Sequence, residues 1–189
     1  MAVYTKKDIR GFLENGESLE FAELNGSQLV GINLPKLSLK GASLQDADLR
    51  YANLAGVIFE EANLKGANLT GSKLSGANLA GANLENALLD NADLLRVDLR
   101  KACLKKASLT HASLRTTDVT GADFTEADLR GANLTGAKGC LTAKFNNADL
   151  TGANVTYTGL DQVDLKNAGV KVDGNTKGLK MHVMKFVEV

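Results

Sequence analysis

Leucine returns at every fifth position along most of this 189-residue chain, and that spacing fits no regular secondary structure. The series runs from Leu19 to Leu134, where Phe59, Val119 and Phe124 are the exceptions. In an α-helix, five residues rotate a side chain by about 140°, so these leucines would scatter around the helix. In a straight strand, the odd step would place alternate leucines on opposite faces. The spacing therefore excludes both a long amphipathic helix and an ordinary strand.

A small residue, usually alanine, stands two positions before each leucine, as at Ala67 and Ala77. Residues two apart in a short extended segment point the same way, so both can face inward before the chain turns a corner. Four such segments close a coil of about 20 residues, and coils can stack about 4.8 Å apart through main-chain hydrogen bonds. Aromatic residues make up 5% of the chain and Trp is absent, so the core must consist of Leu and Ala. The pattern predicts an all-β solenoid.

Glycine often fills the place two after each leucine, as at Gly66, Gly71 and Gly136. A type II turn needs a positive φ at this place, which glycine adopts readily and asparagine tolerates. Asn86 occupies the same place. This position is therefore predicted to be the corner of each coil.

The period breaks once, because Ala137 and Ala143 are six residues apart. We expect one inserted residue near 138–140, with Cys140 serving as a degenerate centre. The units then resume at Phe145 and continue to Val170. Together they predict nearly eight coils of about 20 residues each.

Three segments, Ala67–Gly71, Ala77–Gly81 and Ala132–Gly136, read ANLTG, ANLAG and ANLTG and resemble the pentapeptide-repeat family. The resemblance implies a right-handed quadrilateral β-helix and no catalytic residue. Family members resemble scaffold or interaction proteins, and many are cyanobacterial. One branch, the quinolone-resistance proteins, binds DNA gyrase by imitating duplex DNA, which supplies an alternative function.

Residues 1–16 are expected to form a helical cap, because the exposed edge of the first coil would otherwise invite end-to-end growth. Thr5 and Asp8 have the spacing of a capping box. Tyr4 and Ile9 have the spacing of a hydrophobic staple. These features predict a short α-helix over the first coil.

The repeat is expected to span residues 17–172. Residues 173–189 depart from it and begin with a turn-forming Asp-Gly-Asn sequence. For this tail two interpretations stay open, a second cap or a homodimer contact.

Net charge and cysteine usage limit the partners and the compartment. Lys+Arg and Asp+Glu balance at 22 each, which argues against direct nucleic-acid binding and weakens the DNA-mimic alternative. Cys103 and Cys140 lack CxxC spacing and are expected to be free thiols in a reducing compartment. The N-terminal stretch lacks the apolar run of a signal peptide, and no apolar run reaches 18 residues. We expect a cytoplasmic protein without membrane contact.

The sequence predicts no catalytic site, metal or cofactor. His111 and His182 have no Cys or His at metal-ligand spacing, and the sequence has no phosphate-loop, GxSxG or HExxH motif. The recurrent Asp and Asn before each centre are expected to bond nearby backbone rather than to serve as catalytic carboxylates. The expected partner is another protein.

Positive charge gathers between residues 95 and 115, where Asp98 is the only acid. We call the basic residues of this stretch the basic belt, and they are Arg96, Arg100, Lys101, Lys105, Lys106 and Arg115. In the coil geometry they circle one turn of the solenoid. Beside them, Leu88 and Leu95 fall at outward places and predict a small apolar patch.

Two interpretations of the basic belt stay open. It docks an acidic partner, or its charges are neutralised within the chain. The second interpretation predicts that Lys105 pairs with Glu85 and Lys106 with Glu126, because each pair is about one coil apart.

Overall fold

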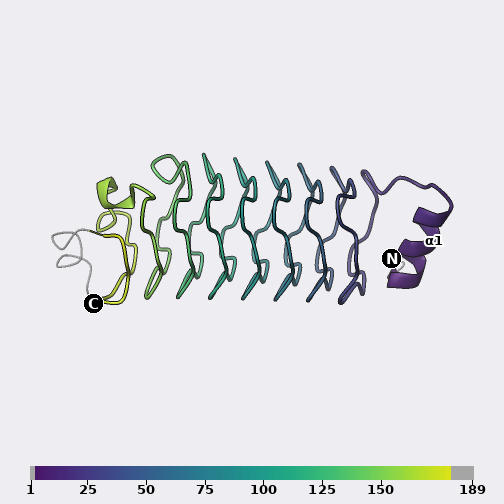
Figure 1. The fold of residues 1–189 in the computed structure, drawn as a ribbon, viewed down its shortest axis with the longest axis horizontal. Coiled ribbons are helices and arrows are strands. Elements are labelled where there is room, and N and C mark those ends of the chain that lie inside the picture. Colours follow the sequence, from purple (N-terminus) through teal and green to yellow (C-terminus); the bar gives the residue numbers. More distant parts are fainter. Residues whose placement is uncertain (1–2, 180–189) are drawn as a thin grey trace.

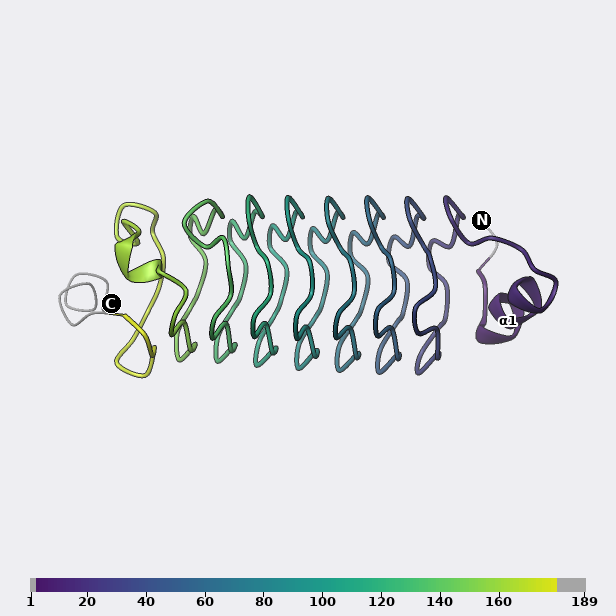
Figure 2. The same ribbon diagram turned by 45° about the horizontal axis from the view of Figure 1, so that its top comes forward.

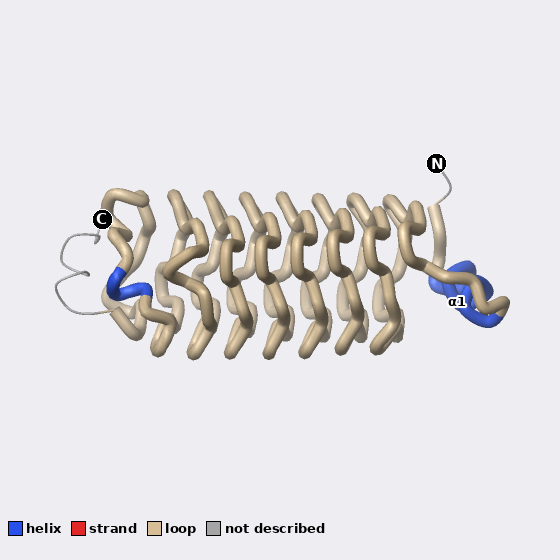
Figure 3. Tube along the Cα trace, turned by 90° about the horizontal axis from the view of Figure 1, so that it is seen from above, coloured by secondary structure: helices blue, strands red, loops and turns tan. Residues whose placement is uncertain are grey.

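The protein is described by a computed structural model that covers residues 3–179. Figure 1 shows a rod of stacked coils with α1 (Lys6–Glu14) at one end. A short 3₁₀-helix, η1 (Leu160–Gln162), lies towards the other end, as the blue segments of Figure 3 show. Between these helices the sides of the coils pair as single parallel bridges, such as Asn63 with Asn83.

Main-chain hydrogen bonds join each coil to the next at a constant offset. The Leu64 N–H donates to the Asn83 carbonyl at 2.7 Å, and the Gly66 N–H donates to the Glu85 carbonyl at 2.9 Å. The Ala67 N–H closes a β-turn on the Leu64 carbonyl at 3.0 Å. Parallel bridges 20 residues apart repeat this pattern along the rod, which confirms the predicted coil length.

The interior consists of the leucine and alanine positions, which are buried as predicted. Phe59 and Phe124 take two of the leucine places and are fully enclosed. Phe124 stacks on Phe145, with ring centroids 5.1 Å apart. The five-residue spacing therefore creates a continuous apolar core along the rod axis.

On many sides of the coils, the Asp or Asn before the centre accepts a hydrogen bond from the backbone. The Asn78 side chain accepts a hydrogen bond from the Ala80 N–H at 3.0 Å, and Asn68 accepts one from the Thr70 N–H at 3.1 Å. This confirms the predicted turn role of these side chains.

The corners of the regular coils from residue 21 to residue 136 have a left-handed backbone, but many of them lack glycine. Gly66 has φ +68° as predicted, yet Lys36, Tyr51 and Glu126 adopt φ +61°, +56° and +60° at the same place. Glycine is therefore common at this place but is not required there. Figure 2 shows the corners stacked in rows along the rod.

The pairing offset between coils increases by one residue near residues 138–144. Asp118 pairs with Lys138 at an offset of 20, whereas Asp123 pairs with Lys144 at an offset of 21, so the extra residue lies between the two pairs. Cys140 is buried in the core, as expected of a degenerate centre.

The regular register predicted as far as Val170 is wrong beyond Val155. Asp149 pairs with Lys171, an offset of 22, and η1 interrupts the following side. A 3₁₀-helix rises about 2.0 Å per residue and a strand about 3.3 Å, so more residues are needed to cross one side. Leu160 stays buried, but the last predicted units are irregular.

The chain before α1 pairs with the first coil. Thr5 bridges Gln28 in parallel, and the Gln28 N–H donates to the Tyr4 carbonyl at 2.8 Å. The predicted capping box is present, with the Thr5 N–H donating to the Asp8 carboxylate at 2.7 Å. These hydrogen bonds from Thr5 lower the pKa of Asp8. Ile9 is fully buried.

The predicted turn after the repeat is present. Asp173 accepts hydrogen bonds from the Asn175 N–H at 3.1 Å and from the Gly152 N–H at 2.8 Å. The rest of the tail prediction falls on 180–189, which lie outside the described residues. Within residues 3–179, no helix is long and apolar enough to cross a membrane.

Candidate functional site

The structure divides the basic belt among three corners of the rod. Arg100 and Lys101 share one corner, and Lys105 and Lys106 share the next. Arg96 and Arg115 occupy a third corner on consecutive coils, because the Arg96 N–H donates to the Arg115 carbonyl at 3.1 Å. Successive corners face different directions, so one flat partner surface cannot contact all six residues.

The lysine corner is neutralised within the chain. Lys106 Nζ lies 3.6 Å from a Glu126 carboxylate oxygen, as predicted. Lys105 pairs with Asp123 at 3.6 Å, so its predicted pairing with Glu85 is wrong.

A competing lysine explains the error. Lys65 stands one coil before Glu85 at the same corner and pairs with it at 3.0 Å. Asp123 is the more enclosed acid and also attracts Lys144 at 3.8 Å. Although burial alone would raise the pKa of Asp123, hydrogen bonds from Thr125 and the two lysines hold it below its usual value.

Arg100 is held by an acid of its own coil. Its Nη2 lies 2.6 Å from Asp98 Oδ2, and its Nε lies 2.9 Å from Asp98 Oδ1. This bidentate contact fixes the orientation of the guanidinium. These hydrogen bonds lower the pKa of Asp98. Lys101, beside it, is exposed and makes no ion pair with any residue in the described range.

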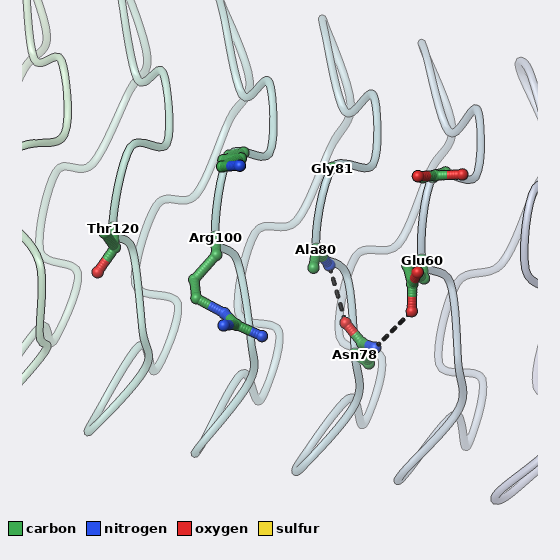
Figure 4. A pocket seen from close by; sticks show the side chains of 8 residues that line it. Glu60, Asn78, Ala80, Gly81, Arg100 and Thr120 are labelled. Atoms are coloured by element: carbon green, nitrogen blue, oxygen red, sulfur yellow. Dashed lines mark hydrogen bonds between the residues drawn. The ribbon is translucent and has the colours of Figure 1, made fainter.

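A concavity of about 500 Å³ opens at the Arg100–Lys101 corner, and we call it the corner notch. Figure 4 shows Ala80 and Gly81 between an acidic and a basic wall. The lining residues are Glu60, Glu61, Asn78, Ala80, Gly81, Arg100, Lys101 and Thr120. The notch exists because the intervening coil carries the two smallest residues at its corner.

The acidic wall is also partly ordered. Glu60 pairs with Lys40 at 2.8 Å and accepts a hydrogen bond from the Asn78 amide at 3.3 Å. The pKa of Glu60 is lowered by the hydrogen bond from Lys40. Glu61 is exposed and has no ion-pair partner within residues 3–179. Sequence reasoning missed this wall because Glu60 and Glu61 are remote from the basic residues in the chain.

The third corner combines charge with apolar surface, and we call Arg96, Arg115 and Leu95 the arginine corner. Both arginines are exposed, and neither forms an ion pair in the part of the chain that the structure describes. Leu95 is half-buried beside them. The predicted partner of Leu95 in an apolar patch, Leu88, is 40% exposed but faces outward from a different side of the coil.

Seven successive corners of this region lack glycine, and all have φ between +54° and +58°. They are Asn86, Asn91, Arg96, Lys101, Lys106, His111 and Thr116. A left-handed backbone costs a residue other than glycine roughly 1–2 kcal/mol, with less cost for asparagine. Glycine corners flank the run at Gly81 and Gly121. The basic belt therefore lies within the longest run of non-glycine corners in the described chain, and the absence of glycine from this stretch is visible in the sequence.

The two thiols differ in environment. Cys140 is buried, and burial raises the pKa of its thiol to about 12, which suppresses the reactive thiolate. Cys103 is half-buried on one side of a coil. Within residues 3–179, no three His, Cys, Asp or Glu residues are grouped so that they could hold a metal ion.

These features define a solenoid repeat protein with a uniform core and an individual set of corner residues. Pentapeptide repeats match the chain in 8 copies, over residues 18–50, 42–79, 77–115, 102–138 and 143–168. The chain belongs to the pentapeptide-repeat family. Among curated protein sequences, none matches it significantly.

Several solved pentapeptide-repeat structures are similar. HetL from the cyanobacterium Nostoc sp. strain PCC 7120, involved in heterocyst differentiation regulation, is 28% identical, with 89% of this chain and 80% of HetL covered and a TM-score of 0.41. A protein from the Arabidopsis thaliana thylakoid lumen is 32% identical, with 56% and 70% covered and a TM-score of 0.48. QnrB1, a plasmid-mediated fluoroquinolone resistance protein, is 22% identical, with 82% and 81% covered and a TM-score of 0.47.

Proposed function

We propose that this protein is a non-catalytic scaffold that binds an acidic protein partner through the arginine corner. The observation that carries the proposal is the placement of Arg96, on a strained backbone at φ +56°, one coil from Arg115, with no ion pair for either arginine in the described chain. Glycine would relieve that strain, so the arginine is retained at a cost to stability. Lys36 has the same strain in this row, but the next coil carries Ala55 and Gly56 there, so the second arginine distinguishes this corner.

The chemistry of the arginine corner suits an acidic protein surface. Two guanidiniums on consecutive coils can each bind a carboxylate in a bidentate manner, and Leu95 adds apolar contact. Arginine is enriched at protein interfaces, whereas lysine is depleted. The neutralised pair of Lys105 and Lys106 is less suited to this role, because a partner would have to displace Asp123 and Glu126.

The test is affinity capture from a native lysate of the source cells, quantified by mass spectrometry. The wild type is compared with the Arg96→Glu/Arg115→Glu double variant. Lys36→Glu is the matched control, because Lys36 occupies the same row of corners with φ +61° and is exposed. We expect a partner that the wild type and the control capture and the double variant loses. A partner retained by the double variant would disprove the role of the arginine corner, and capture of no protein would contradict the scaffold function.

The proposal includes the finer features of the fold. We infer a right-handed quadrilateral β-helix from the family, with α1 as the cap of its first coil. The pairing of Thr5 with Gln28 and the burial of Ile9 support the cap. Deletion of residues 1–16 should then promote end-to-end association, measured by light scattering. The free Cys103 and Cys140 support a reducing compartment, and we propose the cytoplasm.

The alternative, a gyrase-binding DNA mimic, has less support from the surface charge. A mimic of duplex DNA needs a continuous acidic face. Along the corner that holds the notch, the sign of the charge instead changes from Lys40 to Glu60 to Arg100. Inhibition of gyrase supercoiling by micromolar protein would favour the alternative over the scaffold.

A further inference from the structure

The charges at the corner notch change sign about its centre. Ala80 and Gly81 form the neutral centre. One coil towards the N-terminus the same corner carries Glu60 and Glu61, and one coil towards the C-terminus it carries Arg100 and Lys101. With about 4.8 Å between coils, the acidic and basic walls are roughly 10 Å apart.

The alternation continues one coil further on each side. Lys40 lies two coils before the centre and pairs with Glu60 at 2.8 Å. Two coils after the centre the corner carries Thr120 and Gly121, and Asp118, on the side that leads to this corner, accepts a hydrogen bond from the Thr120 hydroxyl at 2.6 Å. Asp98 holds the equivalent place one coil earlier, where it pairs with Arg100. The charge of the corner residues is therefore positive, negative, neutral and positive, with the acid of Asp118 beside the last corner.

We propose that the corner notch is a self-association surface on which a second copy of this chain packs antiparallel. A two-fold axis perpendicular to the rods, at the level of Ala80, brings each residue opposite the residue equally far on the other side of that level. Glu60 of one copy then meets Arg100 of the other, and Glu61 meets Lys101. Each contact occurs twice.

A parallel pair of rods is disfavoured by the same charges. A two-fold axis along the rods would place Glu61 against Glu61 and Lys101 against Lys101, and like charges repel. A heterologous partner would place no constraint on how the charges are distributed about Ala80. Opposite signs at equal distances from one level are what an antiparallel two-fold contact requires.

The residues of the notch are prepared for such a contact. The Glu60 carboxylate is held by Lys40, and the Arg100 guanidinium is held by Asp98. Contact between copies would link these two pairs into a network of four alternating charges. Glu61 and Lys101 are exposed, and neither has an ion-pair partner in the described chain. They can therefore bind across the interface without breaking an existing pair.

This surface is separate from the arginine corner, so the two proposals can fail independently. The self-association should be weak and sensitive to salt, because exposed ion pairs are individually weak and charges are screened within about 10 Å at 0.1 M salt. Sedimentation equilibrium of the full chain at low and high salt measures it directly. We expect a dimer at low salt that dissociates as salt is added.

Charge reversal tests the pairing. The Glu61→Lys variant sets two lysines against each other at both copies of this contact, and the Lys101→Glu variant sets two glutamates against each other there. The association constant of each single variant should be at least about tenfold lower than that of the wild type. An equimolar mixture of the two variants should recover the dimer as a heterodimer, because one of its two contacts keeps the original pair and the other has two reversed partners. Recovery of the dimer in the mixture would also show that both variants are folded.

Two further samples make the test decisive. The Glu61→Lys/Lys101→Glu double variant should self-associate like the wild type, and Lys36→Glu, at another row of corners, should not affect association. A wild type that stays monomeric at low salt would overturn the proposal. A dimer that the single variants leave unchanged would also overturn it and would favour the C-terminal tail as the contact. Failure of the double variant to recover the dimer would disprove the antiparallel pairing.

Discussion

Replacing Gly139 by alanine should destabilise the rod far more than the same change at Gly76. Both glycines have a left-handed backbone, with φ +80° and +70°. A Cβ on Gly76 would have no heavy atom within 4 Å. A Cβ on Gly139 would lie 2.5 Å from both the N and Cα of Thr120. The two substitutions therefore share the backbone strain and differ in the steric clash.

The magnitudes follow from these two contributions. Alanine in the left-handed region costs about 1–2 kcal/mol, partly offset by a less flexible unfolded chain. We expect Gly76→Ala to lower the free energy of unfolding by about 1 kcal/mol. Main-chain atoms of Thr120 cannot swing aside as a side chain can, so Gly139→Ala should cost about 1–3 kcal/mol more, the usual cost of overpacking.

Urea unfolding of both variants measures the difference, with hydrogen exchange to locate it. Each coil contacts only its neighbours, so the loss of amide protection in Gly139→Ala should be greatest in the coils that contain Thr120 and Gly139. Equal destabilisation by the two substitutions would refute the reasoning, since it would mean that the inserted residue is not confined by the preceding coil.

Three other substitutions probe the core, the corners and the acid response. Ser72 is 1% exposed, and its hydroxyl has no hydrogen-bond partner within residues 3–179. Ser72→Ala should therefore raise the free energy of unfolding by about 1 kcal/mol, measured by urea unfolding. Ala77→Ser, on the next side of the coil, should lower it. Lys101→Gly should raise the melting temperature. Glycine relieves a left-handed strain of about 1–2 kcal/mol, and this gain exceeds the cost of about 0.5–1 kcal/mol that comes from the greater entropy of the unfolded chain. The pKa of Asp98 is lowered by hydrogen bonds from Arg100, so the stability from this pair is present above the unfolded pKa of about 3.9 and is lost as pH falls through the lower folded pKa. Asp98→Asn should therefore weaken the loss of stability below about pH 4, measured by urea unfolding across pH.

The sequence predicted the features of the fold that depend on the backbone. Leu and Ala two apart, repeated every five residues, leave one way to bury both, so the core and the 20-residue pairing followed from spacing. The insertion followed from one interval of six between Ala137 and Ala143. The irregular end did not, because Leu160 and Leu165 keep the period although η1 changes the rise per residue.

The site was less predictable, because it depends on long side chains that compete for partners. Spacing placed Lys105 one coil from Glu85, but Lys65 is equally near and takes that acid. Spacing also placed Arg100 in the basic belt, but Asp98 two residues earlier binds its guanidinium within the same coil. Interactions 20 residues apart follow from the repeat, whereas the choice among several such neighbours needs the coordinates.

Stability and recognition are opposed at the corners of this rod. The interior positions accept few residue types, so the side chains that could recognise a particular partner lie at the outward places and at the corners. At a corner, any side chain beyond glycine must accept the left-handed backbone, as Arg96 and Lys101 do at φ +56° and +57°. Lys101→Gly should therefore stabilise the rod and weaken the proposed self-association together. A variant at this corner that gained stability and kept its association would show that the strain serves no recognition, and would remove the main argument for function at the non-glycine corners.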